Sequence, residues 1–146
     1  MAYNRATAYS NRCYAYIFKR EYDRAIADGD KAIESNPERA KAYSNRRYGY
    51  ISKEEYDQAA ADCDKAIELD PKLAIAYASR CYIYTQKQEF DRAIADCDKA
   101  IGLDPKDAHF YMRRCWAYTR KGDYKRANVD CNKGITMKPS LGTIPP

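Results

Sequence analysis

The sequence contains a single histidine, His109, and none of its six cysteines form a C-x-x-C motif. Protein zinc sites are built from clustered Cys and His ligands, so the sequence does not favour a metal site. It also lacks a Ser/His/Asp or Cys/His constellation, a glycine-rich phosphate loop and a cluster of carboxylates. We therefore expect neither enzymatic activity nor a cofactor.

Long apolar segments are also missing. No apolar run approaches the roughly 20 residues that a membrane-spanning helix needs, and the N-terminal residues MAYNRATAYSNRCYAY contain no apolar signal region. Apolar residues make up 45% of the chain and charged residues 32%, which is ordinary for a soluble helical protein. We expect a cytoplasmic protein without a membrane partner.

What the sequence does contain is a repeat of 34 residues. The segment EFDRAIADCDKAIGLDP at 89–105 recurs in related form at 21–37, 55–71 and 123–139. The repeats span 6–39, 40–73, 74–107 and 108–141, with a short tail at 142–146, and we treat 1–146 as one domain. Self-similarity at such a period indicates a repeat array in which neighbouring units stabilise one another.

Each repeat carries the signals of two helices. A proline closes the second helix of every repeat, because proline has no N–H and disfavours helical backbone at the residue before it. Acidic residues precede or open that second helix, where the helix N-terminus favours negative charge. Eight helices joined by short connections predict antiparallel neighbours throughout the chain.

This pattern is similar to the tetratricopeptide repeat over residues 6–139. The matching residues are the large Tyr9, Tyr43, Tyr77 and Tyr111, the small Cys13, Cys81 and Cys115, the aromatic Tyr16, Tyr50, Tyr84 and Tyr118, the alanines Ala25, Ala59, Ala93, Ala127, Ala32, Ala66 and Ala100, and the prolines Pro37, Pro71, Pro105 and Pro139. Arg47 and Gly134 depart from the pattern, at a small-residue position and an alanine position. The resemblance implies an all-α, right-handed superhelical solenoid of four antiparallel helix-turn-helix hairpins, with a concave protein-binding groove.

Four cysteines form pairs that are equidistant from a turn between repeats. In an antiparallel helix pair such residues face each other, so we expect these cysteines to meet where one repeat stacks on the next. They would be small, weakly polar filler in a tight interface, and a disulfide or bound metal at the pairs is the alternative. The pairs are Cys63 with Cys81 and Cys97 with Cys115, and Cys13 and Cys131 are left without an in-chain partner.

An arginine precedes an aspartate by 16 residues in every repeat. This spacing places the two residues across the turn within one repeat, and we expect an interhelical ion pair with a structural role. The pairs are Arg12–Asp28, Arg46–Asp62, Arg80–Asp96 and Arg114–Asp130.

In the family that the sequence resembles, one face of the first helix of each repeat lines the groove. Here that face carries a ladder of large rings, which are typical of binding hot spots, although some of them could instead pack sideways in the core. The predicted peptide-binding groove consists of Tyr14, Lys41, Asn45, Tyr48, Tyr82, His109, Arg113, Trp116 and Arg120.

The positive charge lies in the fourth repeat. The chain has a net charge of +5, and residues 108–141 alone contain eight basic and two acidic residues. Such a field would steer an acidic partner. Chaperone-binding members of the family hold a C-terminal Glu-Glu-Val-Asp in a carboxylate clamp, but here only Asn11, Lys41, Asn45 and Arg113 match parts of it. The sequence therefore does not favour clamp-type recognition.

We expect a protein–protein interaction scaffold that binds an extended or helical segment in the groove. Nucleic-acid binding is disfavoured, because the cations do not form a stripe along the whole array. The alternative is a structural array, either a fragment or a designed chain, that has no dedicated ligand. It would form a homo-oligomer by end-to-end stacking, because Ser140–Pro146 is too short and too rich in Gly and Pro to form the capping helix that family members often carry.

Overall fold

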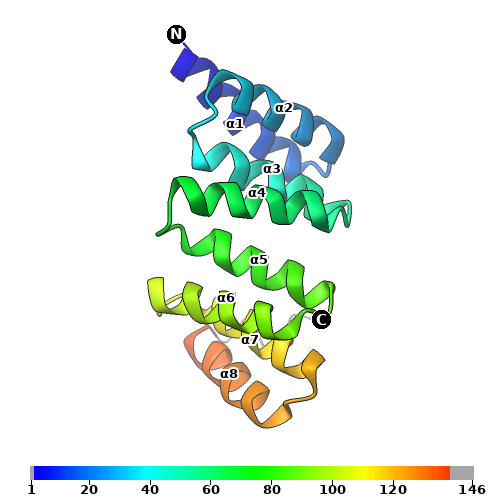
Figure 1. Ribbon diagram of the computed structural model, residues 1–146, viewed down its shortest axis with the longest axis vertical. Helices are drawn as coiled ribbons and strands as arrows, with labels where there is room; N and C mark the ends of the chain where they lie inside the picture. The colour runs from blue at the N-terminus through cyan, green and yellow to red at the C-terminus, as the bar shows by residue number, and fades with distance from the viewer. Residues whose placement is uncertain (1, 139–146) are drawn as a thin grey trace. The chain divides into compact units, whose positions relative to one another are not determined.

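The computed structural model describes residues 2–138, and all regular secondary structure within that range is helical. The chain divides into two compact units, residues 1–73 and 74–146. Each unit contains two antiparallel helical hairpins (Figure 1). The helices are α1 (Ala2–Phe18), α2 (Tyr22–Ser35), α3 (Ala40–Ser52) and α4 (Tyr56–Leu69) in the first unit, and α5 (Ala74–Gln86), α6 (Phe90–Leu103), α7 (Ala108–Lys121) and α8 (Tyr124–Met137) in the second. The predicted all-α repeat fold is confirmed, and residues 139–146 lie outside the described part of the chain.

An Asn-Pro or Asp-Pro dipeptide ends the second helix of each of the first three hairpins, as the sequence predicts. Asn36, Asp70 and Asp104 have extended backbone that follows the last helical turn. Their side chains also accept a hydrogen bond from the backbone N–H two residues further on, at 3.1–3.2 Å. This Asx turn directs the chain into the next helix, so the dipeptide both stops one helix and starts the connection to the following one.

The turn within each hairpin relies on a left-handed residue that the sequence analysis did not anticipate. Arg20, Glu54 and Gln88 have φ values of 59°, 60° and 63°, and Gly122 has a φ of 90°. Glycine adopts this conformation without a steric cost, whereas the other three residue types do so less readily. The last hairpin therefore has the least strained turn.

The predicted ion pairs between an arginine and the aspartate 16 residues later are confirmed in all four hairpins. Arg80 contacts Asp96 through Nε and Nη2, at 2.7 Å for each bond, and the other three arginines use the same bidentate edge. Burial lowers the pKa of Arg46, but its bonds to Asp62 and Asp30 outweigh burial and leave the pKa raised. These arginines remain charged and serve to join the two helices of a hairpin.

Two of these arginines also join one hairpin to the preceding one. Arg46 on α3 donates through Nη1 to Asp30 on α2, and Arg114 on α7 donates in the same way to Asp98 on α6, both at 2.7 Å. A lysine just after or at the end of the same helix makes a second contact. Lys53 reaches Asp23 at 2.8 Å, and Lys121 reaches Asp91 at 2.7 Å.

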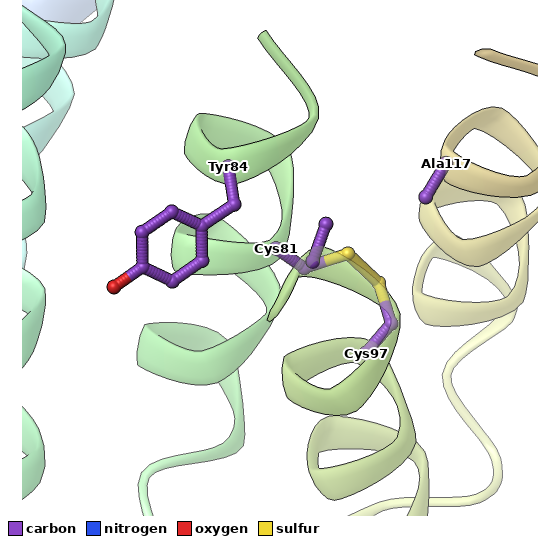
Figure 2. Packing of buried hydrophobic residues seen from close by; sticks show 5 residues of the cluster. Cys81, Tyr84, Cys97 and Ala117 are labelled. Carbon is purple, nitrogen blue, oxygen red and sulfur yellow. A yellow bond between two sulfur atoms is a disulfide. The ribbon is translucent and has the colours of Figure 1, made fainter. Parts of the chain in front are cut away.

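The cysteine pairing expected from the sequence is wrong. Cys81 forms a disulfide with Cys97 rather than Cys63, and Cys115 forms one with Cys131 rather than Cys97. Each bond joins the two helices of one hairpin, with Cα–Cα distances of 5.4 and 5.3 Å, and Figure 2 shows the first bond between α5 and α6.

The physical reason for the error is that Cys81, Cys97 and Cys115 each have another cysteine at the symmetric position about two different turns. The cysteines of each bond are 16 residues apart, the same separation as the Arg–Asp pairs. They are therefore equidistant from the turn within the repeat, and that turn brings them together. Cys131 accordingly has a partner, while Cys13 and Cys63 are buried thiols in the first unit.

Small buried residues let the helices approach closely. The predicted alanines Ala25, Ala59 and Ala93 have no exposed surface, and Ala127 has almost none. Gly134, which departs from the alanine pattern, is explained by Met112 on α7, because a Cβ at Gly134 would lie 2.6 Å from the Met112 sulfur. The smaller residue on one helix thus accommodates the larger side chain on the other.

Candidate binding surface

The predicted site residues lie on the first helix of each hairpin. In the first unit they lie on α1 and α3, and in the second unit on α5 and α7. Their spacing of three or four residues along one helix puts them on a common face.

In the first unit, Tyr14 and Lys41 are exposed and Asn45 is not. The Tyr14 side chain on α1 is 47% exposed and makes an edge-to-face contact with Phe18, with ring centroids 4.9 Å apart. Asn45 on α3 is buried, and its amide donates to the backbone oxygen of Ser10 at 2.9 Å and to its Oγ at 3.0 Å. Asn45 therefore joins α3 to α1, and its amide nitrogen is already engaged.

Tyr48 is covered by Arg47, the residue that departs from the small-residue pattern. The Arg47 guanidinium carbon lies 4.3 Å from the centroid of the Tyr48 ring, and Nη1 donates to Ser44 Oγ at 2.6 Å. Arg47 has no exposed surface, and its Nε and Nη2 find no hydrogen-bond partner within the described residues. Sequence reasoning identified the departure but not its stacking on the predicted groove residue.

In the second unit the structure brings four predicted residues into two stacked pairs. The guanidinium of Arg113 on α7 lies 5.5 Å from the ring centroid of Tyr82 on α5, and that of Arg120 lies 5.4 Å from the centroid of Trp116. Both rings are half-buried and Arg120 is exposed. Arg113, Trp116 and Arg120 follow one another at helical spacing on α7. This α5/α7 surface, Tyr82, Arg113, Trp116 and Arg120, therefore combines aromatic rings with cations.

His109 lies in a shallow depression at the beginning of α7. Its backbone N–H donates to the side chain of Asp107, which caps the helix, at 2.9 Å. The depression has a volume of about 430 Å³ and also includes Lys106, Met137 and Lys138. The predicted residue is thus exposed among side chains of both charges, since Asp104 and Asp107 also line the depression.

The described part of the chain shows neither a metal cluster nor a membrane span. Within residues 2–138 no group of three or more His, Cys, Asp or Glu side chains is arranged to hold a metal ion. No helix in that range combines the length and apolar character needed to cross a bilayer. Stacked guanidinium groups of the kind found on the α5/α7 surface can bind carboxylates.

Comparison with protein families gives one family description along most of the chain. Tetratricopeptide repeat profiles match residues 3–39, 48–73 and 74–107. A comparison with curated protein sequences finds no match.

Similar solved structures have the same fold at low sequence identity. MamA 41-end from Desulfovibrio magneticus RS-1 is 21% identical with a TM-score of 0.81, covering 92% of this chain and 76% of that one. The Arabidopsis OM64 TPR domain is 21% identical with a TM-score of 0.75, covering 86% and 98%. The first TPR of Spaghetti (RPAP3), bound to the HSP90 peptide SRMEEVD, is 19% identical with a TM-score of 0.73, covering 87% and 93%.

Proposed function

Because the chain belongs to the tetratricopeptide repeat family, whose fold generally mediates protein–protein interaction, we propose that it is a scaffold whose α5/α7 surface binds an acidic peptide segment. The observation that carries this proposal is the pair of cation–π stacks, Arg113 on Tyr82 and Arg120 on Trp116. The Arg113–Tyr82 stack joins neighbouring repeats, so the two helices contribute to one surface.

Stacking supports binding in two ways. A guanidinium held over a ring loses less conformational freedom when it binds, which favours affinity. Its planar N–H groups match the two oxygens of a carboxylate, and Trp, Tyr and Arg are the residues most enriched in binding hot spots. The excess of basic residues in 108–141 would also speed the approach of an acidic segment.

In the first unit, Tyr14, Lys41 and Tyr48 provide a second and smaller surface of the same kind. Tyr14 and Lys41 are exposed, and Tyr48 is stacked against Arg47. We assign Asn45 a supporting role in this surface, because its bonds to Ser10 fix α3 against α1.

The peptide SRMEEVD is a suitable acidic probe, because it carries three carboxylate side chains and a structurally similar protein binds it. Since the carboxylate clamp is incomplete in this chain, we expect the peptide to bind through the α5/α7 surface and not in the clamp mode. Its counterpart with Gln and Asn in place of Glu and Asp tests the role of charge at constant shape. Titration calorimetry should show that the wild type prefers the acidic peptide. A wild type that binds both peptides equally, or neither, would refute the assignment of an acidic ligand.

Variants then locate the site. Trp116→Ala and Arg120→Ala are each expected to weaken binding of the acidic peptide by roughly tenfold, the loss of a moderate hot spot. Arg126→Ala is the matched control. Arg126 is exposed and lies over the Tyr118 ring, but it belongs to α8 and not to the α5/α7 surface. If Arg126→Ala weakens binding as much as Arg120→Ala, the effect is one of net charge and the α5/α7 surface is not the site.

A further inference from the structure

The outer face of α8, the second helix of the last hairpin, has a charge pattern unlike that of α2 and α6, the second helices that a following hairpin covers. Within each unit, the second helix of the first hairpin presents two aspartates, seven residues apart, to cations of the next hairpin. On α2 these are Asp23 and Asp30, and on α6 they are Asp91 and Asp98. Every stacking contact of this kind thus has the carboxylates on the covered helix and the cations on the covering helix.

The repeat of 34 residues identifies the corresponding positions on α8. Lys125 replaces Asp91, and Asn132 replaces Asp98. Both side chains are exposed. One acidic position has therefore become basic and the other neutral, so α8 could not bind the Arg and Lys of a covering helix as α2 and α6 do.

The apolar positions of the same face are partly kept and are exposed on α8. Tyr124, which corresponds to Phe90, is 66% exposed, and Ile135, which corresponds to Ile101, is 38% exposed. On α6 the corresponding pair is half-buried. Ile94 on α6 packs against the buried cluster of Cys115, Tyr118 and Ala127, which shows that this residue of α6 lies against the following hairpin; its counterpart on α8 is Asn128.

A second copy of this chain is a poor match for the α8 face. The helix that would continue the array is α1, where Arg12 and Lys19 stand at the positions of Arg114 and Lys121. In that register Lys19 would meet Lys125, and Arg12 would meet the uncharged Asn132. Both carboxylate contacts of the internal stacking would be lost, and one would become a repulsion between like charges.

We propose that the outer face of α8, formed by Tyr124, Lys125, Asn132 and Ile135, binds an amphipathic helix of another protein that carries carboxylates where the helices of this array carry Arg and Lys. The two carboxylates would be seven residues apart, or about 10 Å along a helix, to match Lys125 and the amide of Asn132. The apolar side chains of that helix would cover Tyr124 and Ile135. This surface is separate from the α5/α7 surface, and the same two substitutions prevent head-to-tail stacking of this chain.

A peptide pair tests the charge preference directly. The first peptide has the sequence of residues 106–123 with Cys115→Ser, and the second also carries Arg114→Glu and Lys121→Glu. The wild-type protein should bind the second peptide roughly tenfold more tightly than the first, since the contact with Lys125 changes from repulsive to attractive and the Asn132 amide gains a carboxylate acceptor. The preference should decrease with added salt.

The Lys125→Asp/Asn132→Asp variant should reverse this order and prefer the first peptide, because it restores the charges of α6. The Trp116→Ala variant, which alters the α5/α7 surface, should keep the wild-type order. Equal binding of the two peptides to the wild type, binding of neither peptide, or an order that the α8 variant does not reverse would overturn the proposal.

Sedimentation velocity tests whether a second copy is excluded. The wild type should remain monomeric as its concentration rises, whereas Lys125→Asp/Asn132→Asp should associate, because it provides carboxylates for Arg12 and Lys19 of the next copy. Lys19→Asp added to that variant should weaken the association. Self-association of the wild type that Lys19→Asp abolishes would show that the α8 face binds a second copy instead.

Discussion

Arg47 offers a test of what a buried cation without a direct ion pair costs this fold. Its side chain is fully buried, its Nε and Nη2 have no hydrogen-bond partner among the described residues, and its satisfied contacts are Ser44 Oγ and the Tyr48 ring. Methionine has a similar volume and no polar hydrogen, so Arg47→Met removes the charge without leaving a large cavity. We expect this variant to be more stable than the wild type.

The magnitude follows from the groups that change. Two buried donors without partners cost about 1–3 kcal/mol each, so their removal stabilises by roughly 2–6 kcal/mol. The variant loses one hydrogen bond, about 1 kcal/mol, and one cation–π contact, about 0.5–2 kcal/mol. The difference lies between about −1 and +4.5 kcal/mol, with a central value of roughly 2 kcal/mol in favour of the variant. Each kcal/mol shifts the Tm of a unit of this size by roughly 4–8 °C.

Urea and thermal unfolding of the two proteins measure this difference. Arg46→Met is the matched control at the neighbouring position, because Arg46 is paired with both Asp62 and Asp30. Its loss leaves the buried Asp62 without its cation, and we expect destabilisation on the order of 3 kcal/mol. If Arg47→Met is no more stable than the wild type, the guanidinium is not a liability and the reasoning from its unsatisfied donors is wrong.

Three further predictions concern the interior. Reducing agent should destabilise the second unit by about 3 kcal/mol per disulfide, as expected for loops of this length. Cys81→Ser/Cys97→Ser removes one of the two disulfides and should reproduce one half of that loss in urea unfolding. An unfolding transition that reduction does not change would contradict a stabilising role of the disulfides. Burial raises the pKa of Cys13 to about 12, so the unfolded state releases this proton first and stability should fall as pH rises from about 8.5 towards 12. Cys13→Ala should show a shallower decline, and equal slopes would argue against a buried thiol. Asn45→Ala should lower stability by about 1–3 kcal/mol, because it leaves the buried acceptors of Ser10 unpaired, whereas Lys41→Ala should have little effect in the same thermal unfolding experiment.

The repeat period predicted the helices well, because the signals that end them are local. Proline stops a helix through its own geometry, and the Asn or Asp before it forms its turn with a residue two positions away. The ion pairs across each hairpin were predictable for a related reason. Arg80 and Asp96 can meet only across the turn between them, so their separation was sufficient to identify the contact.

The cysteines show where separation alone is insufficient. Cys97 is symmetric with Cys81 about one turn and with Cys115 about the next, and the spacing of the cysteines alone does not choose between the two turns. The neighbouring Arg80–Asp96 pair could have decided the question, because residues adjacent to a known contact at the same separation lie in the same register. The choice depends on which side of a helix faces its hairpin partner, a property of packing that spacing does not reveal.

The positions of the proposed surface residues along α7 follow from the sequence, whereas their contacts do not. Helical spacing placed Trp116, Arg113 and Arg120 on one face, as the structure shows. The stacking of Arg47 on Tyr48 and the burial of Asn45 depend on how closely α3 approaches α1, which is determined by side-chain volumes on both helices. Packing that depends on the side chains of two helices cannot be predicted from the residue pattern of one helix.

Arg46 and Arg114 make the formation of one hairpin inseparable from its docking. Each holds an aspartate of its own hairpin with one edge and an aspartate of the preceding hairpin with its remaining nitrogen. The stability of a repeat array is approximately the sum of the stability of each hairpin alone and the stability of each interface between neighbouring hairpins. A residue shared in this way contributes part of its free energy to the interface and not to the single hairpin. An isolated hairpin then retains only part of its stabilisation, and the pair of hairpins in each unit becomes the smallest piece of this chain that we expect to fold cooperatively.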